Sequence, residues 1–166
     1  MKKIAIVIFS VLLFGIGLPA IGARHKHEKR HRHNGNITSV SVLHPGCYGR
    51  CPQYSIEINS DGMMTYTALR FNPDTGIFEK KISPEKAMEL INQFTTYRVD
   101  TCQNIYKTRV PDISGLVITI QYNDSTKTIR DANFGPYFLK QLANSIDQLG
   151  IKDDSTWRKT GMPKNY

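Results

Sequence analysis

The chain has 166 residues and a formal net charge of +8 at pH 7, and this length is typical of a single domain. Most of the excess charge lies near the N-terminus, because residues 34–166 hold 15 Lys and Arg against 13 Asp and Glu. A nearly neutral folded part argues against a nucleic-acid-binding domain, and we expect no nucleic-acid partner.

The N-terminus carries the three parts of a secretory signal peptide in their usual order. Two lysines precede an apolar run over 4–18, and small residues follow over 19–23. The apolar run is shorter than the roughly 20 residues that a membrane-spanning helix needs. We therefore expect residues 1–23 to be a cleaved signal peptide, cut between Gly22 and Ala23 or after Ala23. The mature chain would be periplasmic or secreted, without a membrane anchor.

Residues 24–36 form a basic, His-rich tail that has no apolar side chain and is expected to be disordered. Neutral imidazoles bind Cu(II), Ni(II) or Zn(II), and two His-x-His pairs make the tail a candidate metal site. Neighbouring cations repel a metal ion, so the alternative is a solvated basic leader. The candidate ligands are His25, His27, His31 and His33.

Alternating apolar and polar residues predict strands from position 37 onward. The first strand lies around Val40, and a hairpin follows in which Asp61-Gly62 turns the chain after a strand over 54–58. The pattern leaves two phases open for the returning strand. Its inward residues are either Met64, Tyr66 and Ala68 or Thr65, Thr67 and Leu69.

The run Ser83-Pro84-Glu85 predicts a helix start. The Ser83 side-chain oxygen can cap free amides, and Pro84 stands where no amide is needed. The Glu85 carboxylate lies at the positive end of the helix dipole. Apolar residues at i, i+3, i+4 and i+7 spacing follow, which is typical of a helix with one buried face. They are Ala87, Leu90, Ile91 and Phe94.

A second hairpin is expected over 116–129, and Pro136 opens a second helix that Gly150 would cap. The expected order is β-ββ-α-ββ-α. It favours an α+β fold, with an antiparallel sheet of four to five strands and two helices packed on one face. This single domain would span 37–150, and 151–166 would be a loose extension in which Trp157 can dock.

Three cysteines in an exported chain tend to pair, and an odd count leaves one outside a pair. We expect a Cys47–Cys51 disulfide that shapes a tight loop, with Cys102 as a small apolar residue. The alternative is a redox or soft-metal pair with His44 nearby. A further possible site near the motif involves His44 and Cys102.

Catalytic motifs are hard to find, because the domain has one histidine, no nucleophile elbow and no phosphate-binding glycine loop. We therefore expect no catalytic residue and favour an exported binding or interaction module over an enzyme. Its partner would be an unknown protein, peptide or glycan held by exposed aromatic side chains. The alternative is a protein that handles Cu, Ni or Zn, or a thiol-redox protein. It would use the tail histidines and the pair Cys47 and Cys51. We expect no other cofactor.

The run CYGRCPQYSIEINSD at 47–61 resembles the start of an uncharacterised family of exported bacterial domains with a Cys-(Phe/Tyr)-Gly-x-Cys-Pro-x-Tyr motif. The run KISPEKAMELINQF at 81–94 is similar to the Ser-Pro-Glu helix of that family, and the likeness extends over roughly 37–149. The resemblance implies a small exported α+β domain of unknown function. It transfers no catalytic residue, and this chain departs from relatives with lipid anchors in having no anchor cysteine.

Overall fold

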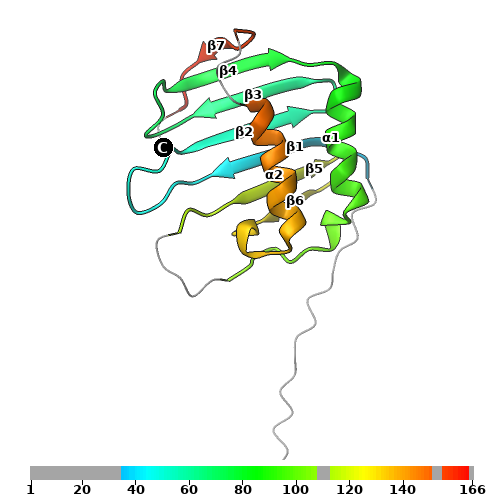
Figure 1. The fold of residues 1–166 in the computed structure, drawn as a ribbon. Helices are drawn as coiled ribbons and strands as arrows, with labels where there is room; N and C mark the ends of the chain where they lie inside the picture. The colour runs from blue at the N-terminus through cyan, green and yellow to red at the C-terminus, as the bar shows by residue number, and fades with distance from the viewer. Residues whose placement is uncertain (1–34, 108–112, 151–154, 165–166) are drawn as a thin grey trace, which may run out of the picture.

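The computed structural model of the chain describes residues 35–107, 113–150 and 155–164. These residues form one antiparallel sheet with two helices on one face (Figure 1). In chain order the elements are β1 (Ile37–His44), β2 (Tyr54–Asn59), β3 (Met63–Ala68), β4 (Gly76–Lys81), α1 (Pro84–Thr96), η1 (Val99–Thr101), β5 (Val117–Tyr122), β6 (Thr126–Ile129), η2 (Ala132–Phe134), α2 (Tyr137–Gly150) and β7 (Arg158–Gly161). The spatial order of the strands is β6-β5-β1-β2-β3-β4-β7.

The described sheet has seven strands, so the expected sheet of four to five strands, in the order β-ββ-α-ββ-α, is wrong, although the α+β class holds. β4 and β7 are the two strands that the hydrophobic pattern did not predict. β4 places Lys80, which is 9% exposed, on its inward side, where a half-buried strand normally carries an apolar residue. β7, with the sequence RKTG, has no large apolar side chain and is held by backbone pairing to β4 at the edge of the sheet. It lies within 151–166, the segment expected to be a loose extension.

The core lies between the sheet and the two helices. β1 is central and pairs antiparallel with β2 and β5, and in this register Val42 lies opposite both Ile56 and Ile118. Packing decides the phase of β3 that the sequence leaves open: Met64, Tyr66 and Ala68 face the core.

Both helices begin and pack largely as predicted. Ser83 caps α1, with its side chain accepting a hydrogen bond from the Lys86 amide at 3.2 Å, and the four predicted apolar residues of α1 are buried. Gly150 is the last residue of α2. A Cβ atom there would collide with the Cδ1 atom of Ile56, so this glycine allows close contact between α2 and β2.

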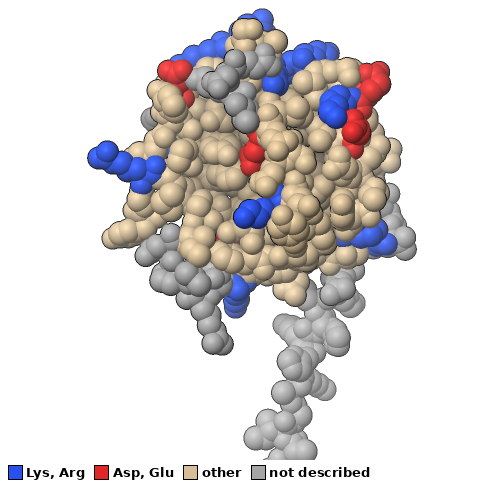
Figure 2. Space-filling view, viewed as in Figure 1, with Lys and Arg blue, Asp and Glu red and all other residues tan. Residues whose placement is uncertain are grey.

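α2 crosses the sheet, contacts β1 and β2, and ends over β2 (Figure 1). Seen from this helix side, most charged side chains lie toward the rim of the molecule, while an acidic and a basic group lie nearer its middle (Figure 2). Within the described ranges, no helix combines the length and the apolar character needed to cross a membrane.

Candidate functional site

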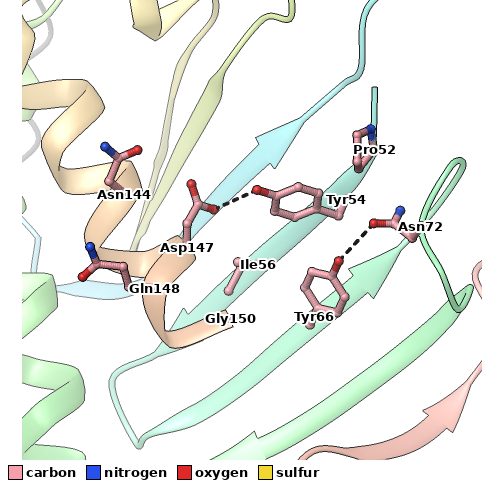
Figure 3. A pocket seen from close by; sticks show the side chains of 9 residues that line it. All are labelled: Pro52, Tyr54, Ile56, Tyr66, Asn72, Asn144, Asp147, Gln148 and Gly150. Atoms are coloured by element: carbon pink, nitrogen blue, oxygen red, sulfur yellow. Dashed lines mark hydrogen bonds between the residues drawn. The ribbon is translucent and has the colours of Figure 1, made fainter. Parts of the chain in front are cut away.

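A pocket of about 430 Å³ opens on the helix side of the sheet, between the C-terminal half of α2 and strands β2 and β3 (Figure 3). Its volume falls in the range of small-molecule sites. The strands contribute two tyrosine rings and an isoleucine, α2 contributes a carboxylate, two amide side chains and its last glycine, and the loops contribute a proline and an asparagine. The lining residues are Pro52, Tyr54, Ile56, Tyr66, Asn72, Asn144, Asp147, Gln148 and Gly150.

Asp147 is the centre of a hydrogen-bond network at the wall of this pocket. The Nε2 atom of His44 lies 3.1 Å from Oδ1 and 3.0 Å from Oδ2 of Asp147. The Tyr54 hydroxyl donates to Oδ1 of the same carboxylate at 3.4 Å. Because an ionised carboxylate only accepts hydrogen bonds, the Nε2–H group of His44 donates. The network joins β1, β2 and α2, and so holds the carboxylate in one position.

Aromatic rings from successive strands form a row beside Asp147. His44 stacks on Tyr54 with ring centroids 4.4 Å apart, Tyr54 lies 5.5 Å from Tyr66, and Tyr66 lies 6.1 Å from Trp157. These separations are typical of favourable aromatic contacts. The row continues the apolar core outward to the pocket and to the segment that leads into β7.

Both pocket tyrosines stay protonated well above neutral pH. Burial, followed by the negative charge of Asp147, raises the pKa of Tyr54 above its ordinary value. The same two causes, in the same order, raise the pKa of Tyr66. Each hydroxyl is therefore a neutral hydrogen-bond donor, and the negative potential of Asp147 reaches both rings.

Hydrogen bonds from Asn72 fix the far wall of the pocket. Its Oδ1 atom accepts from the Tyr66 hydroxyl at 3.2 Å, and its Nδ2 atom donates to the carbonyl oxygens of Gln53 at 2.6 Å and Arg70 at 3.1 Å. These contacts tie the loop after β3 to the segment before β2. Pro52 and Asn72 consequently belong to one connected wall.

A family model described as "Domain of unknown function (DUF6438)" matches residues 38–150. The chain belongs to this family. This confirms the expected membership of an uncharacterised domain family. No curated protein matches the chain.

All nine residues that line the pocket, together with His44, lie inside the DUF6438 region, whereas Trp157 lies outside it.

In the DUF6438 domain, Cys47 and Cys51 lie at disulfide distance, with sulfurs 1.99 Å apart. They close the loop between β1 and β2, so the loop joins two parts of the site, His44 on one side and Pro52 on the other. The loop tip is open to solvent, since Tyr48 is 91% exposed.

Cys102 and His44, paired in the sequence analysis as a possible site, belong to different parts of the DUF6438 domain. Cys102 follows η1 and packs against the core, and its carbonyl oxygen accepts a hydrogen bond from Lys127 Nζ at 2.6 Å. Lys127 belongs to β6, two strands away from β1 in the sheet. The structure joins His44 to a carboxylate instead.

The candidate metal ligands His25, His27, His31 and His33 lie outside the described residues. Inside the described part of the DUF6438 chain, no group of three or more His, Cys, Asp or Glu side chains is placed to hold a metal ion.

Sequence reasoning named His44, which contacts Asp147, but it did not identify the pocket. One signal was available on α2, where Asn144, Asp147 and Gln148 have i, i+3 and i+4 spacing and follow one edge of the buried stripe. Tyr54 and Tyr66 were assigned to strands and counted among the aromatic side chains that could hold a partner, but nothing in their neighbourhood distinguishes a pocket wall from ordinary core packing.

Proposed function

We propose that this chain is an exported binding module and that the pocket beside Asp147 is its ligand site. The observation that carries the proposal is the position of Asp147, whose carboxylate is held by His44 and Tyr54 at the pocket wall. A polar group held in place before the ligand arrives lowers the ordering cost of binding. A concave shape that combines aromatic rings with convergent polar groups is that of a small-molecule site.

The composition of the wall favours binding over catalysis. A histidine–aspartate pair supports acyl transfer when it activates a nearby hydroxyl or thiol. Among the described residues that line the pocket there is no Ser, Thr, Cys or Lys. The polar groups present, two phenols, three amides and one carboxylate, are suited to hydrogen bonding with a bound molecule.

Export is supported by two independent features. Residues 1–23 have the charge, apolar run and small-residue end of a signal peptide. Cys47 and Cys51 lie at disulfide distance, and such bonds persist in oxidising compartments.

Ligand binding is tested by a fragment screen monitored by NMR of the ¹⁵N-labelled chain, expressed at full length and purified in the form that a bacterial host accumulates. We expect hits to shift the amide signals of Tyr54, Tyr66 and Asp147. A Gln148→Trp substitution should fill the pocket and abolish the hits. Gln141→Trp is the matched control, because Gln141 is also exposed on α2 but does not line the pocket. Hits that map elsewhere, or that survive Gln148→Trp, would show that the pocket is not the site.

Export is tested separately by fractionating the host cells and determining the N-terminus of the purified protein. We expect the chain in the periplasm or medium, beginning at Ala23 or Arg24. A cytosolic chain that still begins at Met1 would overturn this part of the proposal and leave the binding test unaffected.

A further inference from the structure

Within the proposed binding site, the charge of the pocket differs from that of the whole chain. The chain carries a net charge of +8, yet Asp147 is the one charged residue among the described residues that line the pocket. The side chain of Asp147 keeps 21% of its exposure, so the carboxylate is accessible to a ligand as well as bonded to His44. A negative group at a partly dehydrated wall attracts cations and repels anions.

The tyrosine rings add a second attraction for a cation. Tyr54 and Tyr66 line the same pocket, and their ring planes are inclined by 44°, so the two rings form an angled wall and not a parallel stack. The face of an aromatic ring is electrically negative and attracts an ammonium group within about 6 Å of the centroid. Figure 3 shows both rings and the Asp147 carboxylate around one opening.

The α2 side of the pocket offers further acceptors. Asn144 and Gln148 are exposed on α2 next to Asp147, and each amide has a carbonyl oxygen that accepts hydrogen bonds. A primary ammonium has three N–H donors and no acceptor. The polar residues that α2 contributes to the lining therefore offer acceptors, the type of group that an ammonium needs.

We infer that the pocket binds an organic cation with a protonated primary amine, whose nitrogen contacts Asp147 and whose alkyl chain lies along Tyr54 and Tyr66. This inference rests on the proposed function and specifies its ligand class. Burial and, after it, the charge of Asp147 raise the pKa values of both tyrosines. The amine can belong to a free alkylamine or to a lysine side chain of a peptide, since the recognised group is the same.

The test compares three probes of equal chain length, n-butylamine, n-butanol and n-butyrate, in NMR titrations of the labelled chain at pH 7. We expect the amine to bind about tenfold more tightly than the alcohol, with the butyrate weakest. Amine binding should weaken as salt is raised, because part of the attraction is between charges. A lysine-containing tripeptide is titrated beside n-butylamine, and tighter binding of the peptide would identify a protein side chain as the source of the amine.

Four variants separate the contribution of the charge from that of the ring. Asp147→Asn keeps the shape and should reduce amine affinity about tenfold, while Asp124→Asn, on the turn between β5 and β6, is the control and should leave it unchanged. Tyr54→Leu should weaken amine binding several-fold through the lost ring, and Tyr54→Phe, which keeps the ring, should retain it to within about threefold. Thermal unfolding by circular dichroism verifies that each variant is folded.

The outcomes distinguish this inference from the proposed function. If n-butanol or a methyl glycoside binds in the pocket as tightly as the amine, or if Asp147→Asn has no effect, the cation inference is wrong and the binding module stands. If neither the amines nor any fragment perturbs the pocket, both proposals fall. A salt-insensitive amine affinity would likewise contradict the role of the carboxylate.

Discussion

His44 at the end of β1 and Asp147 on α2 are separated by 103 residues in the chain, yet His44 Nε2 lies 3.0 Å from Asp147 Oδ2. The contact connects the central strand to the helix that forms one side of the pocket. It also places the only histidine of the domain beside a carboxylate, in a position where neither side chain is fully exposed.

This contact should contribute measurably to stability. We expect a double-mutant cycle of His44→Ala and Asp147→Ala to give a coupling energy of about 1 kcal/mol, the usual net value for a hydrogen bond to a charged partner that stays partly solvated. Asp147→Ala also removes an acid near the C-terminus of α2, which should stabilise the helix by about 0.5 kcal/mol through the helix dipole. This gain is smaller than the free energy lost with the hydrogen bond. Urea denaturation measures all four proteins, and a coupling energy near zero would show that the contact is energetically neutral.

Gly150→Ala should destabilise the domain although alanine is the better helix former. The gain in helix propensity is about 1 kcal/mol, whereas the collision of the new methyl with Ile56 Cδ1 should cost about 1–3 kcal/mol. Ile56→Val removes that Cδ1 atom, so the double variant should be more stable than the sum of the single changes predicts. Gly49→Ala is the control, because the nearest atom to its Cβ would be Cys47 Sγ at 3.8 Å. Strict additivity in denaturant unfolding would contradict the steric explanation.

Replacement of Cys47 and Cys51 by serine should have a modest effect on stability. The two cysteines are only 4 positions apart, and chain entropy assigns about 2 kcal/mol to a loop of this size, against about 4.7 kcal/mol for a loop of 100 residues. Guanidinium unfolding of the double variant measures the difference. Alkylation and mass spectrometry of the unfolded wild-type chain should detect two additional reactive thiols after reduction, and the same thiol count before and after would exclude the disulfide.

Stability should decline in strong alkali because of buried tyrosines. Burial, with a smaller contribution from Asp100, raises the pKa of Tyr122 to about 12, from the ordinary value of about 10 that it has in the unfolded chain. In the folded state Tyr122 thus keeps its hydroxyl proton to higher pH than in the unfolded chain. Its contribution to the free energy of unfolding is therefore complete below about pH 10 and is lost as pH rises from about 10 to 12. Urea midpoints across this range should fall less for Tyr122→Phe than for the wild type. Parallel curves for the two proteins would show that Tyr122 titrates normally.

Trp157 should couple the last strand to the pocket region. Its ring lies 6.1 Å from that of Tyr66 and 4.6 Å from Lys80 Nζ, so Trp157→Ala should lower the free energy of unfolding by about 1–3 kcal/mol. The chain has a single tryptophan, and its fluorescence should therefore report the docking of this segment directly. Lys164→Ala, an exposed change in the same segment, should alter neither stability nor emission. Emission identical to that of the unfolded chain would contradict a docked ring.

A lysine on the inward side of a strand interrupts the alternation of apolar and polar residues, and Lys80 thereby explains why the sequence did not predict β4. Lys80 and Lys127 are both 9% exposed on the inward side of their strands. Lys80 lies over the Trp157 ring, and Lys127 Nζ bonds to the Cys102 carbonyl oxygen. Because these partners are distant in the chain, alternation alone classes both lysines as solvent-facing. β7 was missed for a related reason, since an edge strand depends on backbone pairing and needs no buried side chain.

The local elements of this domain followed from the sequence by itself, because their signals depend on residues within one or two turns or one hairpin. The Ser83 cap, the buried stripe of α1 and the Asp61-Gly62 turn are of this kind. The candidate site was decided only by the tertiary structure. Asp147 faces His44 and Tyr54 because α2 crosses β1 and β2 at one angle and depth, which Gly150 permits by its contact with Ile56. That geometry is a property of the packed core, so no local pattern around any one of these residues could have predicted it.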